Sequence, residues 1–241
     1  MNLATAQVRA SVLELLRYPS FSLSALLFPS VLFLIFVRAY PQPANTRMAG
    51  FAAIAVLGVL FFQFGVGIAA DRVSSWEAYL RTLPAGPRLR FAARICAALV
   101  FAGTAATVVA VVAAATTPVG MPVTRWLALI VALTLGAVPF GLLGIAIGYL
   151  VRPRAALPIA NLLYLPLSYV GGLWAGPTAR LGRHDAWLDL VPTHAWASSL
   201  WSAVGATSFD PAAPALLAVW TVVLGGVAVR AYRRDEGERF S

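Results

Sequence analysis

The residues that could do chemistry are few in this chain, and their spacing forms no catalytic pattern. His184 and His194 have no nearby serine or cysteine in a recognisable arrangement, and the single cysteine, Cys96, lies in an apolar run. No H-E-x-x-H, G-x-S-x-G or cysteine–histidine motif occurs in the sequence. We therefore expect a chain that is not an enzyme and that holds no metal or cofactor of its own. A membrane enzyme acting on a lipid or peptide stays open as an alternative, because catalytic partners can be distant in sequence.

All 18 basic residues are arginines, and the formal net charge is +9. A phosphate-binding Walker loop requires a lysine after its glycines, so the chain cannot bind and hydrolyse ATP in that way by itself. The arginines separate apolar runs, which is typical of loops that flank membrane spans and not of a folded surface that binds nucleic acid. The predicted partner is therefore a lipid bilayer, with no nucleic acid.

Three polar side chains, those of Gln63, Asn161 and Tyr164, lie inside apolar runs. Burying polar groups away from water requires partners or a cavity, so we expect these residues to have polar partners or to line a cavity. No charged residue stands near the middle of an apolar run. A carrier driven by protons or sodium usually has an acidic residue there, so a secondary carrier is a less favoured alternative.

The elements that must position these residues are membrane-spanning helices. Hydrophobic residues make up 60% of the chain and charged residues 11%, as in a polytopic membrane protein. Six charge-free stretches are each long enough for a spanning helix, which takes about 20 residues. The sequence predicts a single all-α integral membrane domain over residues 1–241, with six transmembrane helices at about 19–38, 49–70, 93–115, 126–151, 155–175 and 212–231.

The distribution of arginines predicts how these spans are oriented. With the N-terminus inside, 13 arginines fall on the inner side and 5 on the outer side. The positive-inside rule then places both termini in the cytoplasm, as expected for a multi-pass protein of the bacterial inner membrane. A seventh charge-free stretch, 190–209, contains Pro192, His194 and several serines, so we reject it as a simple span. In residues 5–17 the apolar positions recur at helical spacing and the polar positions lie opposite them, which predicts an N-terminal interfacial helix.

Glycines and a short amphipathic segment complete the pattern. Gly144 and Gly148 form a GxxxG pair, which favours tight helix packing within the subunit more strongly than it favours a dimer face. Between the second and third predicted spans, residues 74–84 read SSWEAYLRTLP. A serine there can cap a short helix, apolar residues recur at helical spacing, and Pro84 ends it. This segment lies on the predicted cytoplasmic side.

The chain here resembles the membrane subunits of ATP-binding-cassette exporters of the ABC-2 type. In that family the residue types of the first cytoplasmic loop follow a characteristic order. This sequence has the same order in Asp71-Arg72, Ser74-Ser75, Trp76-Glu77, Tyr79-Leu80, Thr82-Leu83-Pro84 and Arg88 through Arg94. The resemblance implies that residues 74–84 form a coupling helix, which docks in a groove of a separate ATPase subunit. The implied coupling residues are Ser74, Trp76, Glu77, Tyr79, Leu80, Arg81 and Leu83.

A second stretch, residues 141–174 followed by 187–201, carries the same resemblance. It has a glycine-rich fourth span, a basic turn, an asparagine-bearing fifth span, the Gly171-Gly172 break and then Pro192-Thr193-His194. The resemblance implies that residues 176–206 form outer re-entrant helices that close the pathway. The implied pathway or gate residues are Gln63, Asn161, Tyr164, Gly171, Gly172, His194 and Trp196.

The resemblance also implies an assembly and a function. Two permease subunits, as a homodimer or with a close paralogue, would work with two copies of an ABC ATPase that binds ATP and Mg. An uncharged pathway with aromatic residues suits export of an amphipathic drug, antibiotic, peptide or lipid. Besides the secondary carrier and the membrane enzyme, a purely structural or regulatory membrane subunit stays open.

Overall fold

The computed structural model of this chain describes residues 19–36, 42–74, 87–177 and 188–240. All regular elements in these ranges are helical, which confirms the all-α prediction for the described part of the chain. In chain order they are α2 (Pro19–Phe36), α3 (Ala44–Leu60), the π-helix η1 (Phe61–Val66), α4 (Gly67–Asp71), α6 (Pro87–Thr116), α7 (Val123–Leu150), α8 (Pro153–Val170), the 3-10 helix η2 (Leu188–Leu190), α9 (Pro192–Ala203) and α10 (Ala212–Phe240).

Four helical stretches within the described residues are long and apolar enough to cross a membrane: Ala44–Asp71, Arg94–Thr116, Val123–Leu150 and Ala212–Asp235. They correspond to the second, third, fourth and sixth predicted spans. The first predicted span is represented by the shorter apolar stretch Leu26–Phe36 of α2. The fifth predicted span is the 18-residue helix α8, whose apolar run is interrupted by Asn161 and two prolines. The count of six spans therefore stays a prediction.

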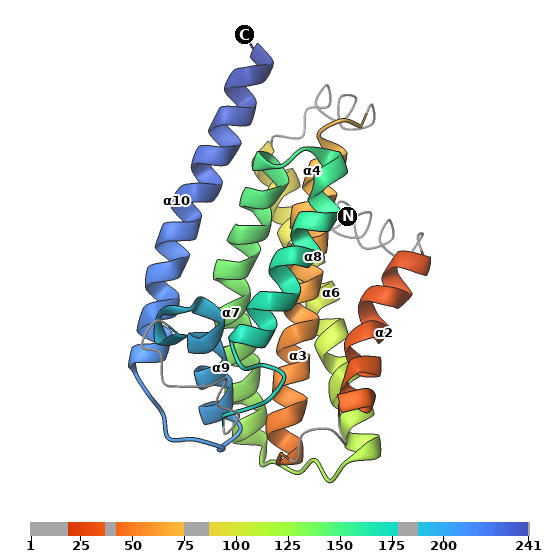
Figure 1. Ribbon diagram of the computed structural model, residues 1–241, viewed down its shortest axis with the longest axis vertical. Helices are drawn as coiled ribbons and strands as arrows, with labels where there is room; N and C mark the ends of the chain where they lie inside the picture. The colour runs from red at the N-terminus through yellow and green to blue at the C-terminus, as the bar shows by residue number, and fades with distance from the viewer. Residues whose placement is uncertain (1–18, 37–41, 75–86, 178–187, 241) are drawn as a thin grey trace.

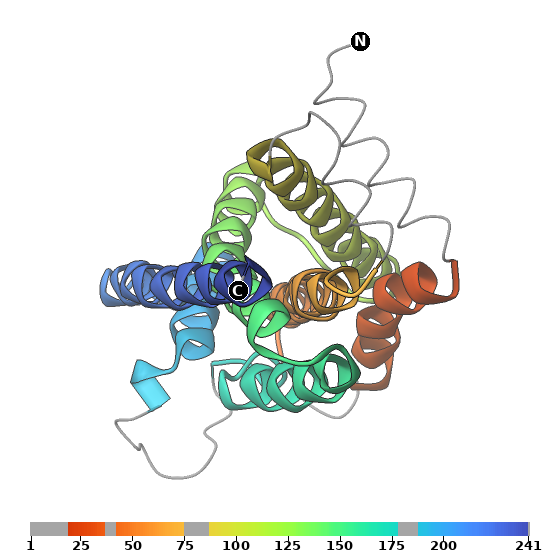
Figure 2. The same cartoon turned by 90° about the horizontal axis from the view of Figure 1, so that it is seen from above.

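Helix α3 forms the centre of the bundle, with α2, α6, α7 and α8 around it (Figure 2). Its residues from Thr46 to Leu60 are all buried. Many of them are alanine or glycine, and small residues allow neighbouring helices to approach closely. Helix α10 packs on the outer side of α7, and much of its surface is exposed.

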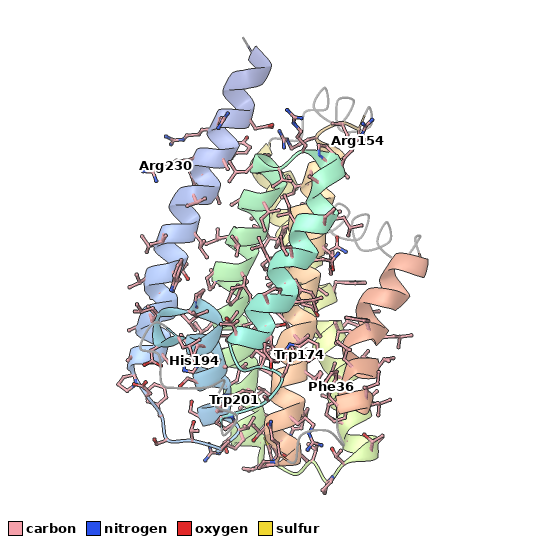
Figure 3. All side chains as sticks on the ribbon, in the orientation of Figure 1. Phe36, Arg154, Trp174, His194, Trp201 and Arg230 are labelled. Carbon is pink, nitrogen blue, oxygen red and sulfur yellow. The ribbon has the colours of Figure 1, made fainter. Side chains whose placement is uncertain are left out.

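The two ends of the bundle differ in charge. Arg154 and Arg230 lie toward the end at the top of Figure 3, and Trp174, His194 and Trp201 lie toward the other end. Helix α4, which Arg72 follows, ends at this upper end, and α8, which Arg152 precedes, begins there (Figure 1). We call this the arginine-rich end. The opposite end contains the starts of α3 and α7 and the turn that follows α8.

The GxxxG pair of α7 packs against the π-helix region. A Cβ on Gly144 would lie 2.7 Å from the Leu60 carbonyl oxygen, and one on Gly148 would lie 2.6 Å from the Phe64 carbonyl oxygen. Contacts this short leave no room for a side chain, so the two glycines bring the backbones of α3, η1 and α7 together. The prediction of tight packing within the subunit is confirmed.

The rejected seventh stretch contains the short helix α9. Trp196 and Leu200 are fully buried, whereas Ser198, Ser199 and Ser202 are partly exposed. The 12 residues of α9 are too few to cross a bilayer, which takes about 20. The helix packs against α7, α10 and α3 in the half of the bundle near the opposite end (Figure 1). Its predicted role as an outer re-entrant helix stays a prediction, and the N-terminal interfacial helix lies outside the described residues.

Candidate functional site

A charged network at the arginine-rich end lies at the base of the predicted coupling segment. Arg94 of α6 donates from Nη1 to Asp71 Oδ2 at 2.5 Å. Its Nη2 donates to the backbone carbonyl of Gln63 at 3.3 Å. Asp71 precedes the segment and Arg94 follows it, so their ion pair joins the two ends of the loop. A charge-assisted hydrogen bond of this kind is stronger than a neutral one.

Arg72 extends the same network to two other helices. Its Nη1 donates to the carbonyls of Gly148 and Val151, each at 3.2 Å, at the end of α7. Its Nη2 forms an ion pair with Asp235 of α10, whose side chain is only 7% exposed. A carboxylate this buried depends on its cationic partner, because an unpaired buried charge is costly. Arg72 therefore ties the chain that leads into the coupling segment to α7 and α10.

Of the predicted coupling residues, the structure describes only Ser74. Ser74 follows α4, and its backbone N–H donates to the Asp71 carbonyl at 3.0 Å. The others lie outside the described residues, and their placement stays a prediction: Trp76, Glu77, Tyr79, Leu80, Arg81 and Leu83.

Two predicted pathway residues, Gln63 and Tyr164, have polar side-chain groups inside the bundle. The Tyr164 side chain of α8 is buried, with its ring against Gly58 of α3 and edge-on to Phe62 at a centroid distance of 5.9 Å. Gln63 follows Phe62 in η1, and its Nε2 is buried with no hydrogen-bond partner among the described residues. Asn161 lies on a different, exposed face of α8, where its Nδ2 donates to the Leu157 carbonyl at 3.1 Å. Asn161 is thus exposed, whereas the Tyr164 side chain of the same helix is buried.

The predicted gate glycines lie in the turn after α8. A Cβ on Gly171 would overlap Thr193 at the start of α9, so the missing side chain lets the turn and α9 touch. Gly172 has a φ of +80°, a backbone conformation that glycine adopts without steric cost. The neighbouring His194 has its Nε2 3.5 Å from Asp189 Oδ1. The structure therefore gathers Gly171, Gly172 and His194 near the start of α9.

Trp196 belongs to the core between α9 and α7. Its indole is fully buried, donates from Nε1 to the Ala132 carbonyl at 2.8 Å, and packs beside Phe140 at a ring-centroid distance of 5.2 Å. Gly136 lies directly against the indole, at a place where a Cβ would overlap it. These contacts anchor α9 on α7.

Sequence reasoning missed the network of Asp71, Arg72, Arg94 and Asp235 as a unit. The sequence placed the two arginines among the positive charges of the predicted inner side and in the first-loop pattern, but it indicated no role for Asp235. The distribution of charges along the chain predicts which loops lie on which side of the membrane. It does not predict which charged residues form ion pairs when they are as far apart in sequence as Arg72 and Asp235. In the described part of the chain, no group of three or more histidine, cysteine, aspartate or glutamate residues could hold a metal ion.

The described helices define a multi-pass helical membrane protein. Over 211 residues the chain is 22% identical to "Putative transport permease YvfS" of Bacillus subtilis (strain 168), an alignment that covers 85% of this chain and 86% of that protein. No known family model matches the sequence, and no solved structure matches it. The similarity extends over most of both chains, so it relates the two sequences as wholes and not by a single motif.

Proposed function

We propose that the chain is the transmembrane permease subunit of an ABC exporter of the ABC-2 type. The observation that carries the proposal is the similarity, over 85% of the chain, to a protein named as a transport permease. The apolar helices and the first-loop pattern around Asp71-Arg72 support it. The chain forms the translocation pathway and hydrolyses no ATP itself.

The proposed assembly has two permease subunits, as a homodimer or with a close paralogue, and two ABC ATPase subunits that bind ATP and Mg. By the positive-inside rule, the arginine-rich end faces the cytoplasm of a bacterial cell, where the ATPases would dock on residues 74–84. The exported compound is an amphipathic drug, antibiotic, peptide or lipid. Gln63 and Tyr164 are the pathway candidates inside the bundle, and the turn at Gly171 with the start of α9 is the candidate outer gate.

The charged network supports a mechanism for coupling. Energy from nucleotide binding reaches the membrane helices only as a difference in contacts between two states. The Asp71–Arg94 pair joins α4 to α6, and Arg72 joins α4 to α7 and α10. A displacement of residues 74–84, which lie between Asp71 and Arg94 in the chain, would therefore act on α4, α6, α7 and α10 together.

Reconstitution with the partner ATPase tests this proposal. Glu77→Ala and Arg81→Ala should reduce substrate-stimulated ATP hydrolysis in proteoliposomes, while membrane insertion stays normal. Asp210→Asn is the matched control, because it also removes one charge, keeps an oxygen for the bond to the Ala212 N–H, and lies beyond α9 near the opposite end. Unchanged stimulated hydrolysis in both variants would overturn the coupling role. Transport by the chain alone would instead identify a secondary carrier.

A further inference from the structure

We propose that Arg94 is a positioning residue that holds the π-helix η1 and thereby sets the rotation of the stem formed by residues 67–74. The inference rests on the proposed function in one respect, since this stem leads into the proposed coupling segment. The hydrogen bonds and packing of η1 carry the structural part of the inference.

The π-helix leaves one backbone carbonyl without its α-helical donor. In an α-helix, the N–H of Gly67 would bond to the Gln63 carbonyl, four residues earlier. Here it points to the carbonyls of Phe62 and Phe64. The π-turn thus frees the Gln63 carbonyl, inside a span where an unpaired backbone group is costly.

Arg94 supplies the missing donor from another helix. Its Nη2 bonds to the Gln63 carbonyl at 3.3 Å, and its Nη1 bonds to Asp71 at 2.5 Å. Gly67 makes room for this, because a Cβ there would lie 2.8 Å from Arg94 Nη2. One guanidinium therefore bridges the freed carbonyl and a carboxylate two turns further along the chain.

Loss of this bridge would favour return of the π-turn to α-helix. A π-turn holds one residue more than an α-turn, so its removal would rotate the following residues by about 100° and shift them by about 1.5 Å along the axis. Asp71 and Arg72 lie on the part that would rotate. The rotation would also separate Phe64 and Ile68 from Gly148, which now packs closely against both. Arg94 thus stabilises one of two orientations of the stem.

Distances between spin labels test the orientation directly. In the full-length chain with Cys96 replaced by alanine, labels at Ser74 and Leu150 report the position of the stem relative to the end of α7. A rotation of 100° moves a point on a helix surface by about 8 Å. In the chain that retains Arg94 we expect one distance between the two labels. In Arg94→Met we expect a second distance, which differs from the first by several ångströms. Arg154→Met, which removes an exposed arginine at the same end, should leave the distance unchanged.

Two further variants keep the test decisive. Gly67→Ala displaces the guanidinium without removing it, so it should produce the same second distance even if Arg94→Met does not fold. Arg94→Lys keeps the charge but bonds to only one of the two acceptors, so it should populate both distances. A single unchanged distance in folded Arg94→Met and in Gly67→Ala would overturn the inference.

The measurement needs no ATPase, which separates this inference from the proposed function. A displaced distance together with unaltered ATPase coupling in Glu77→Ala and Arg81→Ala would support the role of Arg94 and overturn the exporter mechanism. In the reconstituted complex, Arg94→Met should lower the amount transported per ATP hydrolysed, which a simple loss of folded protein would leave unchanged.

Discussion

Replacing Gly136 with alanine should loosen the attachment of α9 to α7. The new Cβ would overlap three indole atoms of Trp196, namely Nε1, Cε2 and Cδ1. The indole is fully buried between Phe140 and the backbone of α7, so it has little room to move away. To restore an ordinary carbon contact of about 3.5 Å, the ring must retreat by about 1.5 Å, and its 2.8 Å hydrogen bond to Ala132 is lost.

The expected loss of stability is the sum of three effects. Overpacking a filled core costs about 1–3 kcal/mol. The lost hydrogen bond costs about 1 kcal/mol. The higher helix propensity of alanine returns about 1 kcal/mol. The net destabilisation is therefore about 1–3 kcal/mol, which is a shift of several degrees in the unfolding temperature of a chain of this length.

Thermal unfolding in detergent at one fixed scan rate measures this shift. Gly103→Ala is the matched control, because that helical glycine on α6 has open space where its Cβ would be and should lose no stability. In the double variant Gly136→Ala with Trp196→Leu, the smaller side chain admits the new methyl group, so the two losses should be less than additive. Equal melting of Gly136→Ala and Gly103→Ala, or strictly additive losses in the double variant, would refute the reasoning.

Three further substitutions test the packing of the bundle in the same unfolding assay. Arg72→Ala should cost about 3 kcal/mol, because it removes the guanidinium that forms an ion pair with the buried Asp235 carboxylate. Asp235→Asn should cost clearly less, since Arg72 keeps its two carbonyl acceptors at the end of α7. The reverse order of the two losses would contradict the proposed role of Arg72. Gly50→Ala should also lower the unfolding temperature, because its Cβ would overlap the Leu173 carbonyl in the turn after α8. A melting temperature equal to that of Gly103→Ala would show that this turn does not pack tightly on α3.

The helices themselves were largely predictable from residue type. Four of the predicted spans correspond to long apolar helices, and the proline, histidine and serines of 190–209 correctly excluded that stretch as a simple span. Helices α3, α6 and α10 extend beyond the predicted spans, since α3 begins at Ala44 and α10 ends at Phe240. A rule based on charge-free runs stops at the first arginine, but an arginine can continue a helix while its head group finds a partner. Arg47 does so by donating to the Gln42 carbonyl at 2.9 Å.

The candidate site was predictable only in its parts. The first-loop pattern pointed to Asp71-Arg72, and polarity within apolar runs pointed to Gln63 and Tyr164. Neither signal predicted that η1 would be a π-helix or that Arg94 would bond to its freed carbonyl. That bond depends on the register of α6 beside α3 and on the absence of a side chain at Gly67.

The sequence by itself determined that this chain is helical and lies in a membrane, because apolar runs of sufficient length must satisfy their own backbone hydrogen bonds in lipid. It also predicted the sidedness of the arginines and the close approach at Gly144 and Gly148. Only the tertiary structure decided which charges pair, because Arg72 and Asp235 meet through the packing of α10 on α7 and not through any local spacing. The same packing placed Trp196 against Gly136, and no single helix could have specified that contact alone.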